Sequence, residues 1–185
     1  MNRLFISLNL PNEIIDRLIK IRQSVWDFNN LNWEPYEKLH LTIKFIGDVS
    51  SEINEKIIND LIFLEKYEEI GCTITKFDFF YRDKKPVILC ARLKIDDSLK
   101  YIADKINKNL EKFSIPLDQK IFNPHITLLR IKNDPVTDFV NSFKNFTFEP
   151  IHFTANSITL YKSELNQNGS KYFAIKNYKL KELEK

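Results

Sequence analysis

The three histidines of the chain each open a short pattern in which a threonine follows two positions later. These tetrapeptides begin at His40, His125 and His152. An imidazole can give or take a proton near neutral pH, and a threonine hydroxyl can donate a hydrogen bond to an anionic oxygen. The repeated pairing of the two groups indicates acid–base chemistry on an anionic substrate.

Strand geometry gives this pattern a physical meaning. Side chains at positions i and i+2 of a strand lie on the same face, about 6.5 Å apart. His40 and Thr42 then share a face, as do His125 and Thr127. Two such strands brought together surround a phosphodiester with two imidazoles and two hydroxyls. One imidazole can protonate the leaving oxygen while the other deprotonates water, and the hydroxyls stabilise charge on the transition state.

The position of each motif in the chain separates the three histidines. The same order of predicted elements, a helix, a strand, a helix and two strands, occurs in both halves, and His40 and His125 occupy equivalent strands. His152 lies in a different predicted strand, so we expect it to be structural. A metal site that uses both other histidines stays open as an alternative, although neither motif contains Asp, Glu or Cys. We expect no bound metal and no cofactor.

The spacing of apolar residues predicts the elements that position these motifs. Strands are expected at 3–10, 39–46, 72–81, 86–93, from about 124, at 148–162 and at 171–177. Helices are expected at 11–27, 50–68 and 97–113, with a short one after 135. The charged residues 82–85 predict a hairpin turn between two of the strands.

This order predicts an α+β fold with mainly antiparallel pairing. Residues 1–185 are expected to form a single domain of two pseudo-symmetric lobes that enclose a groove. About 1–94 carries the first motif and about 95–178 carries the second, while 179–185 is a charged tail.

Composition narrows the class of protein. A chain of 185 residues with 43% hydrophobic residues can bury its own core, and 28 basic against 25 acidic residues give a net charge of only +3. Cys72 and Cys90 form no C-x-x-C pair, which argues against a disulfide framework or structural zinc. With no signal peptide and no apolar run long enough for a membrane span, we expect a cytoplasmic monomer.

The two motifs and their flanks resemble a known family. The chain is similar to the two-histidine (2H) phosphoesterase superfamily and, within it, to the RNA 2′,3′-cyclic phosphodiesterases, also called the LigT or 2′-5′ RNA ligase family. The resemblance covers nearly all of the chain and rests on residues 3–8, Leu10, Pro11, Trp33, 39–47, 124–130, Leu160, Ser163, Gly169 and Tyr172. It implies a bilobal LigT-like fold whose sheets face each other across a V-shaped groove.

The resemblance also implies an activity and a set of roles. Family members hydrolyse 2′,3′-cyclic phosphate ends of RNA or nucleotides to 2′-phosphomonoesters without metal, and 2′-5′ RNA ligase activity is the reverse reaction. His40 is then the proton donor and His125 the proton acceptor, with Thr42 and Thr127 binding the phosphate. The expected partner is RNA or a nucleotide with a cyclic phosphate end, with no membrane and no obligate protein partner.

The resemblance implies two further site residues, each of which lies five positions after one of the two histidines. Arg130 would bind phosphate oxygens with its forked guanidinium, and Phe45 would stack on the terminal base. An offset of five turns a side chain to the opposite face of a regular strand, so a bulge is needed to bring both residues to the site. Lys44, in contrast, shares the face of His40 in a regular strand and would add positive charge there.

Two other kinds of protein remain open. A non-catalytic RNA-end binding protein of the same fold would keep the groove without turnover. A metal-dependent phosphoesterase would use both histidines as ligands.

Overall fold

Alternating apolar residues build the strands of this chain, and apolar residues three and four apart build its helices. The computed structural model describes residues 1–185 except 28–30, 133–134, 136, 168 and 184–185, the last two of which belong to the predicted tail. The strands are β1 (Asn2–Leu8), β2 (Leu41–Val49), β3 (Ile70–Arg82), β4 (Lys85–Ile95), β5 (His125–Arg130), β6 (Ile151–Ala155), β7 (Ser157–Asn166) and β8 (Gly169–Lys179). The α-helices are α1 (Asn12–Val25), α2 (Ser51–Asp60), α3 (Asp97–Leu110) and α4 (Thr137–Asn145).

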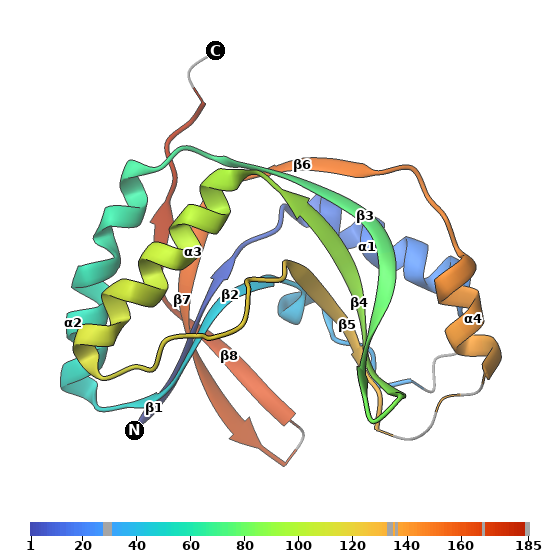
Figure 1. The fold of residues 1–185 in the computed structure, drawn as a ribbon, viewed down its shortest axis with the longest axis horizontal. Coiled ribbons are helices and arrows are strands. Elements are labelled where there is room, and N and C mark those ends of the chain that lie inside the picture. Colours follow the sequence, from blue (N-terminus) through green and yellow to red (C-terminus); the bar gives the residue numbers. More distant parts are fainter. Residues whose placement is uncertain (28–30, 133–134, 136, 168, 184–185) are drawn as a thin grey trace.

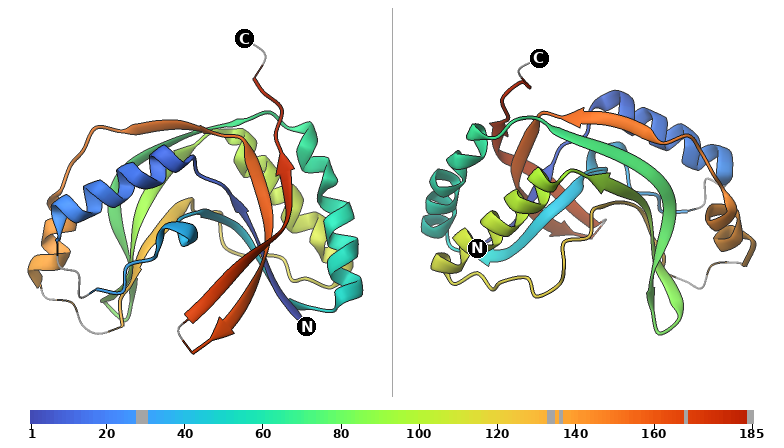
Figure 2. Two further views of the ribbon diagram at one scale, coloured as in Figure 1. Left: turned by 180° about the vertical axis from the view of Figure 1, so that it is seen from behind. Right: turned by 45° about the horizontal axis from the view of Figure 1, so that its top comes forward.

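All eight strands belong to one antiparallel sheet in the order β6-β3-β4-β5-β2-β1-β7-β8. The sheet bends into an arch, with α2 and α3 beside one limb and α1 and α4 beside the other (Figure 1). The two further views place the helices on the outer side of the arch (Figure 2). Since the helices cover the outside, the inner face of the arch is left for the groove. The predicted α+β class with antiparallel pairing is confirmed.

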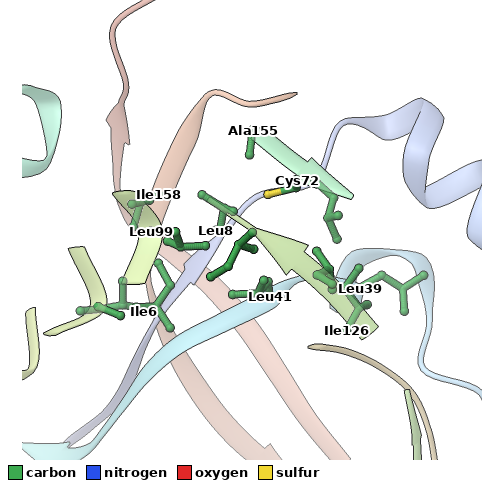
Figure 3. Packing of buried hydrophobic residues seen from close by; sticks show 14 of the residues in the cluster. Ile6, Leu8, Leu39, Leu41, Cys72, Leu99, Ile126, Ala155 and Ile158 are labelled. Atoms are coloured by element: carbon green, nitrogen blue, oxygen red, sulfur yellow. The ribbon is translucent and has the colours of Figure 1, made fainter. Parts of the chain in front are cut away.

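The core lies between the helices and the outer face of the sheet. Helix α3 buries Leu99, Ile102 and Ile106, which follow each other at helical spacing. Figure 3 shows Leu99 close to Leu8 of β1 and Ile158 of β7. This shared core holds the central strands, and therefore the two motifs, in a fixed relation.

The lobes differ from the sequence-based expectation. In the strand order β2 and β1 lie next to β7 and β8, whereas β3 and β4 lie between β6 and β5. Each lobe of the sheet therefore takes two strands from each half of the chain, rather than residues 1–94 and 95–178 forming one lobe each. The entropy cost of closing a loop grows slowly with its length, so strands far apart in the sequence can pair. No local pattern in the sequence shows which distant strands will do so.

Two predicted elements are divided in the structure. The strand expected at 148–162 is β6 and β7, separated at Asn156, and the two lie in different lobes of the curled sheet (Figure 1). The helix expected at 50–68 is α2 followed by a 3-10 segment, Leu61–Lys66. Leu61 and Leu64 are both buried, which suits a 3-10 segment because its residues i and i+3 lie in line.

Candidate active site

The two histidine motifs meet in the middle of the sheet. Strands β2 and β5 are antiparallel neighbours, and Leu41 pairs with Ile126. These are the middle residues of the two motifs, and both are fully buried in the core (Figure 3). Continuing this register by one residue in each direction places each histidine opposite the threonine of the other motif, on the inner face of the arch. The sheet itself therefore assembles two imidazoles and two hydroxyls.

A bulge in β2 brings Phe45 to the same face. Neighbouring residues of β1 pair with Thr42 and Lys44, so Ile43 is an extra residue in β2. Ile43 and Lys44 are both buried, which interrupts the alternation of buried and exposed positions. Phe45 then returns to the face of His40 and is 68% exposed.

A bulge in β5 does the same for Arg130. Neighbouring residues of β4 pair with Thr127 and Leu129, so Leu128 is the extra residue. Leu128 and Leu129 are both buried, and Arg130 follows them with its side chain 57% exposed. The bulge that the odd spacing required is thus present in both strands.

Lys44 does not lie on the face of His40, where the sequence predicted it. The bulge turns its side chain away from the histidines, and the side chain is only 2% exposed. Its ammonium group donates to Asn107 Oδ1 at 2.9 Å and to the Pro116 carbonyl at 2.8 Å, and it pairs with Asp118 at 2.9 Å. Lys44 therefore ties the segment around residue 118 to the sheet and adds no charge to the groove.

A cavity of about 130 Å³ lies over the two motifs. Both His-x-Thr pairs and the residues five positions after each histidine line it, together with four other residues. The lining consists of Glu34, Lys38, His40, Thr42, Phe45, Ile88, His125, Thr127, Arg130 and Tyr172.

His125 is oriented by a backbone hydrogen bond. Its Nδ1 lies 2.7 Å from the Asn123 carbonyl oxygen, which can only accept. Nδ1 must therefore carry the hydrogen, and in the neutral ring Nε2 is left as the proton acceptor. Burial lowers the pKa of His125, the backbone bond opposes this shift, and the positive charges of Arg92 and Arg130 lower the pKa further. The free protein thus holds this imidazole neutral over a wider pH range than usual.

His40 is enclosed more tightly. Its ring stacks on Phe5 with centroids 5.2 Å apart, and its Nε2 lies 3.2 Å from Thr42 Oγ1. Burial lowers the pKa of His40 to about 4, against a hydrogen bond to the Lys38 backbone that raises it, while Arg130 and His125 lower it electrostatically. An anion in the cavity would offset the positive charges of Arg130 and His125 and would raise the pKa of His40.

Four lining residues were not proposed as site residues from the sequence. Glu34 accepts from Arg130 Nε at 3.0 Å, and its carboxylate is largely buried. Glu34 and Lys38 precede the first motif in the chain, which is the one signal that could have drawn attention to them. Tyr172 contributed to the family resemblance but was given no role, and Ile88 lies in an ordinary apolar run.

His152 lies apart from the site, as expected. It is on β6, opposite Thr73 of β3, and its Nδ1 lies 3.0 Å from Thr73 Oγ1. It does not line the cavity over the motifs.

The described residues contain no group of three or more His, Cys, Asp or Glu side chains arranged to hold a metal ion. Within the same residues, every helix is too short or too polar to cross a bilayer.

Comparison with known proteins gives a consistent result. A family model described as LigT-like phosphoesterase matches residues 8–89 and 93–172. The RNA 2′,3′-cyclic phosphodiesterase of Methanocaldococcus jannaschii is 25% identical over 184 residues, covering 95% of this chain and 99% of the relative. The Escherichia coli enzyme of the same name is 26% identical over 178 residues, covering 96% of each chain.

Solved structures share the fold. The protein TT0787 of Thermus thermophilus superposes with a TM-score of 0.80 at 23% identity, covering 97% of this chain and 98% of the other. The E. coli LigT complex with 3′-AMP gives a TM-score of 0.72 at 24% identity and covers 97% of both chains.

Proposed function

Because the chain belongs to the LigT-like phosphoesterase family, we propose that it hydrolyses 2′,3′-cyclic phosphate ends of RNA or nucleotides to 2′-phosphomonoesters. The observation that carries this proposal is the meeting of both His-x-Thr motifs at one cavity of the sheet. Relatives named RNA 2′,3′-cyclic phosphodiesterase match over nearly the whole chain and support it.

The proposed chemistry uses one histidine on each side of the phosphorus. His125 Nε2 takes a proton from water as the water oxygen forms a bond to phosphorus. The bond from phosphorus to the 3′ oxygen breaks, and His40 gives its proton to that oxygen. The product keeps the phosphate on the 2′ oxygen, and proton exchange with solvent restores both imidazoles.

The remaining site residues hold the substrate. Thr42 and Thr127 donate hydrogen bonds to the non-bridging phosphate oxygens, on which charge increases in the transition state. Arg130 adds a charged, forked contact to the same group, in competition with its ion pair to Glu34. Phe45, with most of its ring exposed at the cavity, offers a surface on which the terminal base stacks.

The same groups would support 2′-5′ RNA ligation. In that reaction the 5′ hydroxyl of a second RNA end takes the place of water, and His125 accepts its proton. The bond to the 3′ oxygen breaks as before, so the same two histidines serve both reactions.

The test is hydrolysis of an oligonucleotide that ends in a 2′,3′-cyclic phosphate, in EDTA, with identification of the phosphomonoester formed. We expect the wild type to give the 2′-phosphate, and His40→Ala and His125→Ala each to lose about 10²- to 10⁴-fold in rate. His152→Ala is the matched control, because it removes the third His-x-Thr pattern outside the cavity and should leave the rate unchanged.

Three outcomes would contradict the proposal. Activity that appears only after a divalent metal is added would indicate a metal-dependent phosphoesterase. Tight binding of the cyclic end without conversion would indicate an RNA-end binding protein. Equal losses in the His152 variant and the other two would show that the effect comes from folding.

A further inference from the structure

A second cavity adjoins the one over the histidine motifs. Its volume is about 340 Å³, and it shares Phe45, Arg130 and Tyr172 with the first. Its other polar lining comes from Arg3, Ser163 and Ser170. Among the residues that the structure describes, no carboxylate lines it, so two guanidinium groups face this cavity without an acidic neighbour in its wall.

Arg3 and Phe5 both line this cavity, and the pairing of β1 with β7 is regular from Arg3 to Leu8. Phe5 stacks beneath His40, and Arg3 lies two residues earlier on the same strand face, about 6.5 Å away along the strand. Across the next strand, Ser163 is directly opposite Arg3. Tyr172 of β8 is in turn opposite Ser163. A row of donors thus crosses three strands beside the proposed site of chemistry.

The Arg3 guanidinium has no competing partner within the described part of the chain. Arg130 is paired with Glu34, whereas no described side chain forms a hydrogen bond or ion pair with Arg3. Asp48 lies opposite Arg3 on β2, but it does not line the cavity and forms no ion pair with Arg3. The Arg3 guanidinium is therefore free to bind an anion, and it lies two residues along β1 from Phe5, which stacks on His40.

We propose that this second cavity binds the phosphate on the 5′ side of the terminal nucleoside, through Arg3 with Ser163 and Ser170. The inference rests on the proposed function and deepens it. Phe45 and Arg130 line both cavities, so a nucleoside that stacks on Phe45 with its cyclic phosphate between the histidines lies at their common boundary, within reach of the second cavity. The cavity then favours substrates with a 5′ phosphate, either a link to the preceding nucleotide or a terminal group.

The test compares three substrates in EDTA: uridine 2′,3′-cyclic phosphate, its 5′-phosphorylated form, and the dinucleotide UpU ending in the cyclic phosphate. We expect wild-type kcat/KM to be higher for the two that carry a 5′ phosphate. In Arg3→Gln that advantage should fall by about tenfold or more, because a charged hydrogen bond is lost. The salt dependence of log kcat/KM for UpU should also become shallower by about 0.7.

Arg17→Gln is the matched control, since it removes an exposed arginine on α1 that lines neither cavity. It should keep the wild-type ratio among the three substrates. Melting curves of both variants should coincide with wild type, because Arg3 is exposed and makes no ion pair with any described residue.

The outcomes separate this inference from the proposed function. If kcat/KM is higher for both substrates with a 5′ phosphate, the cavity binds either kind of 5′ phosphate. If it is higher for only one of them, the cavity is specific for the terminal phosphate or for the internucleotide phosphate, whichever that substrate carries. If all three substrates are hydrolysed with equal kcat/KM, or if Arg3→Gln lowers all three equally, the second site is wrong and the proposed function stands. If none is hydrolysed, both are wrong.

Discussion

Strands β2 and β5 carry the same motif, the same bulge and the same backbone anchor, yet their histidines have different neighbours. The ring of His40 is hydrogen-bonded to the backbone of Lys38, and that of His125 to the backbone of Asn123, each two residues earlier. Local sequence therefore makes the two imidazoles nearly equivalent. Any division into acid and base must come from what surrounds them.

The neighbours of His40 are aromatic. Phe5 stacks on it at 5.2 Å, and Tyr172 meets it edge-on at 5.7 Å. This enclosure excludes water, and burial is the main cause of its pKa of about 4. A protonated His40 is therefore costly until an anion lies beside it.

The neighbours of His125 include a charge. Phe80 meets its ring edge-on at 4.7 Å, and Arg92 lies over Phe80 at 4.5 Å. Arg92 also pairs with Asp78 at 3.0 Å and donates to Asn123 Oδ1 at 2.7 Å, so it supports the residue that anchors His125. The two copies of the motif therefore differ in surroundings that residues outside the motif provide.

The largest expected effect tests the roles directly. On the normal substrate both His40→Ala and His125→Ala should lose about 10²- to 10⁴-fold in rate. With sulfur in place of the leaving 3′ oxygen, His40→Ala should recover most of its activity, because a thiolate leaves without a proton. His125→Ala should remain impaired on both substrates. Rescue of His125→Ala in place of His40→Ala would exchange the two assignments.

The residues five positions after each histidine provide the next test. Arg130→Ala should lower kcat by about 10- to 100-fold, because it removes a charged contact to the reacting phosphate. Phe45→Ala should mainly raise KM, by about tenfold, since base stacking is worth about 1–3 kcal/mol. Melting curves should change little in both, because the two side chains are mostly exposed. A normal rate for Arg130→Ala would remove it from the mechanism.

The pH dependence should differ between free and bound protein. In the proposed mechanism the active form has a protonated His40 and a neutral His125, so the pKa values of both imidazoles shape the profile. The pKa of His40 is about 4 in the free protein, and a bound phosphodiester raises it. The limb set by His40 should therefore lie at lower pH in the profile of kcat/KM than in that of kcat. Rates measured between about pH 4 and 9 in inert buffers check this, and a flat profile would contradict the two-histidine mechanism.

The smallest effect concerns Arg92. Its charge lowers the pKa of His125, which acts as a neutral base in the proposed mechanism. Arg92→Gln should therefore move the limb of kcat/KM that is set by His125 to higher pH, whereas Arg92→Lys, which keeps the charge, should move it less. An unchanged limb in Arg92→Gln would show that Arg92 only positions Asn123.

Local residue spacing was sufficient to predict the two His-x-Thr pairs and the strands that carry them. His40 and Thr42 share a face because their separation of two matches the strand repeat, and the same holds for the second motif. The recurrence in equivalent strands was enough to set His152 aside. The odd offset to Phe45 and Arg130 even required the bulges that the structure contains.

Tertiary structure decided the rest. Periodicity assigns a side chain to a face only while a strand stays regular, and whether it does depends on the strands that pair with it. The bulge in β2 therefore exchanged Lys44 for Phe45 at the groove. Glu34 reached the site because Trp33 forms a bridge with Leu129, a contact between segments nearly one hundred residues apart. Such long-range pairings depend on the whole packed sheet, and no local spacing of residues encodes them.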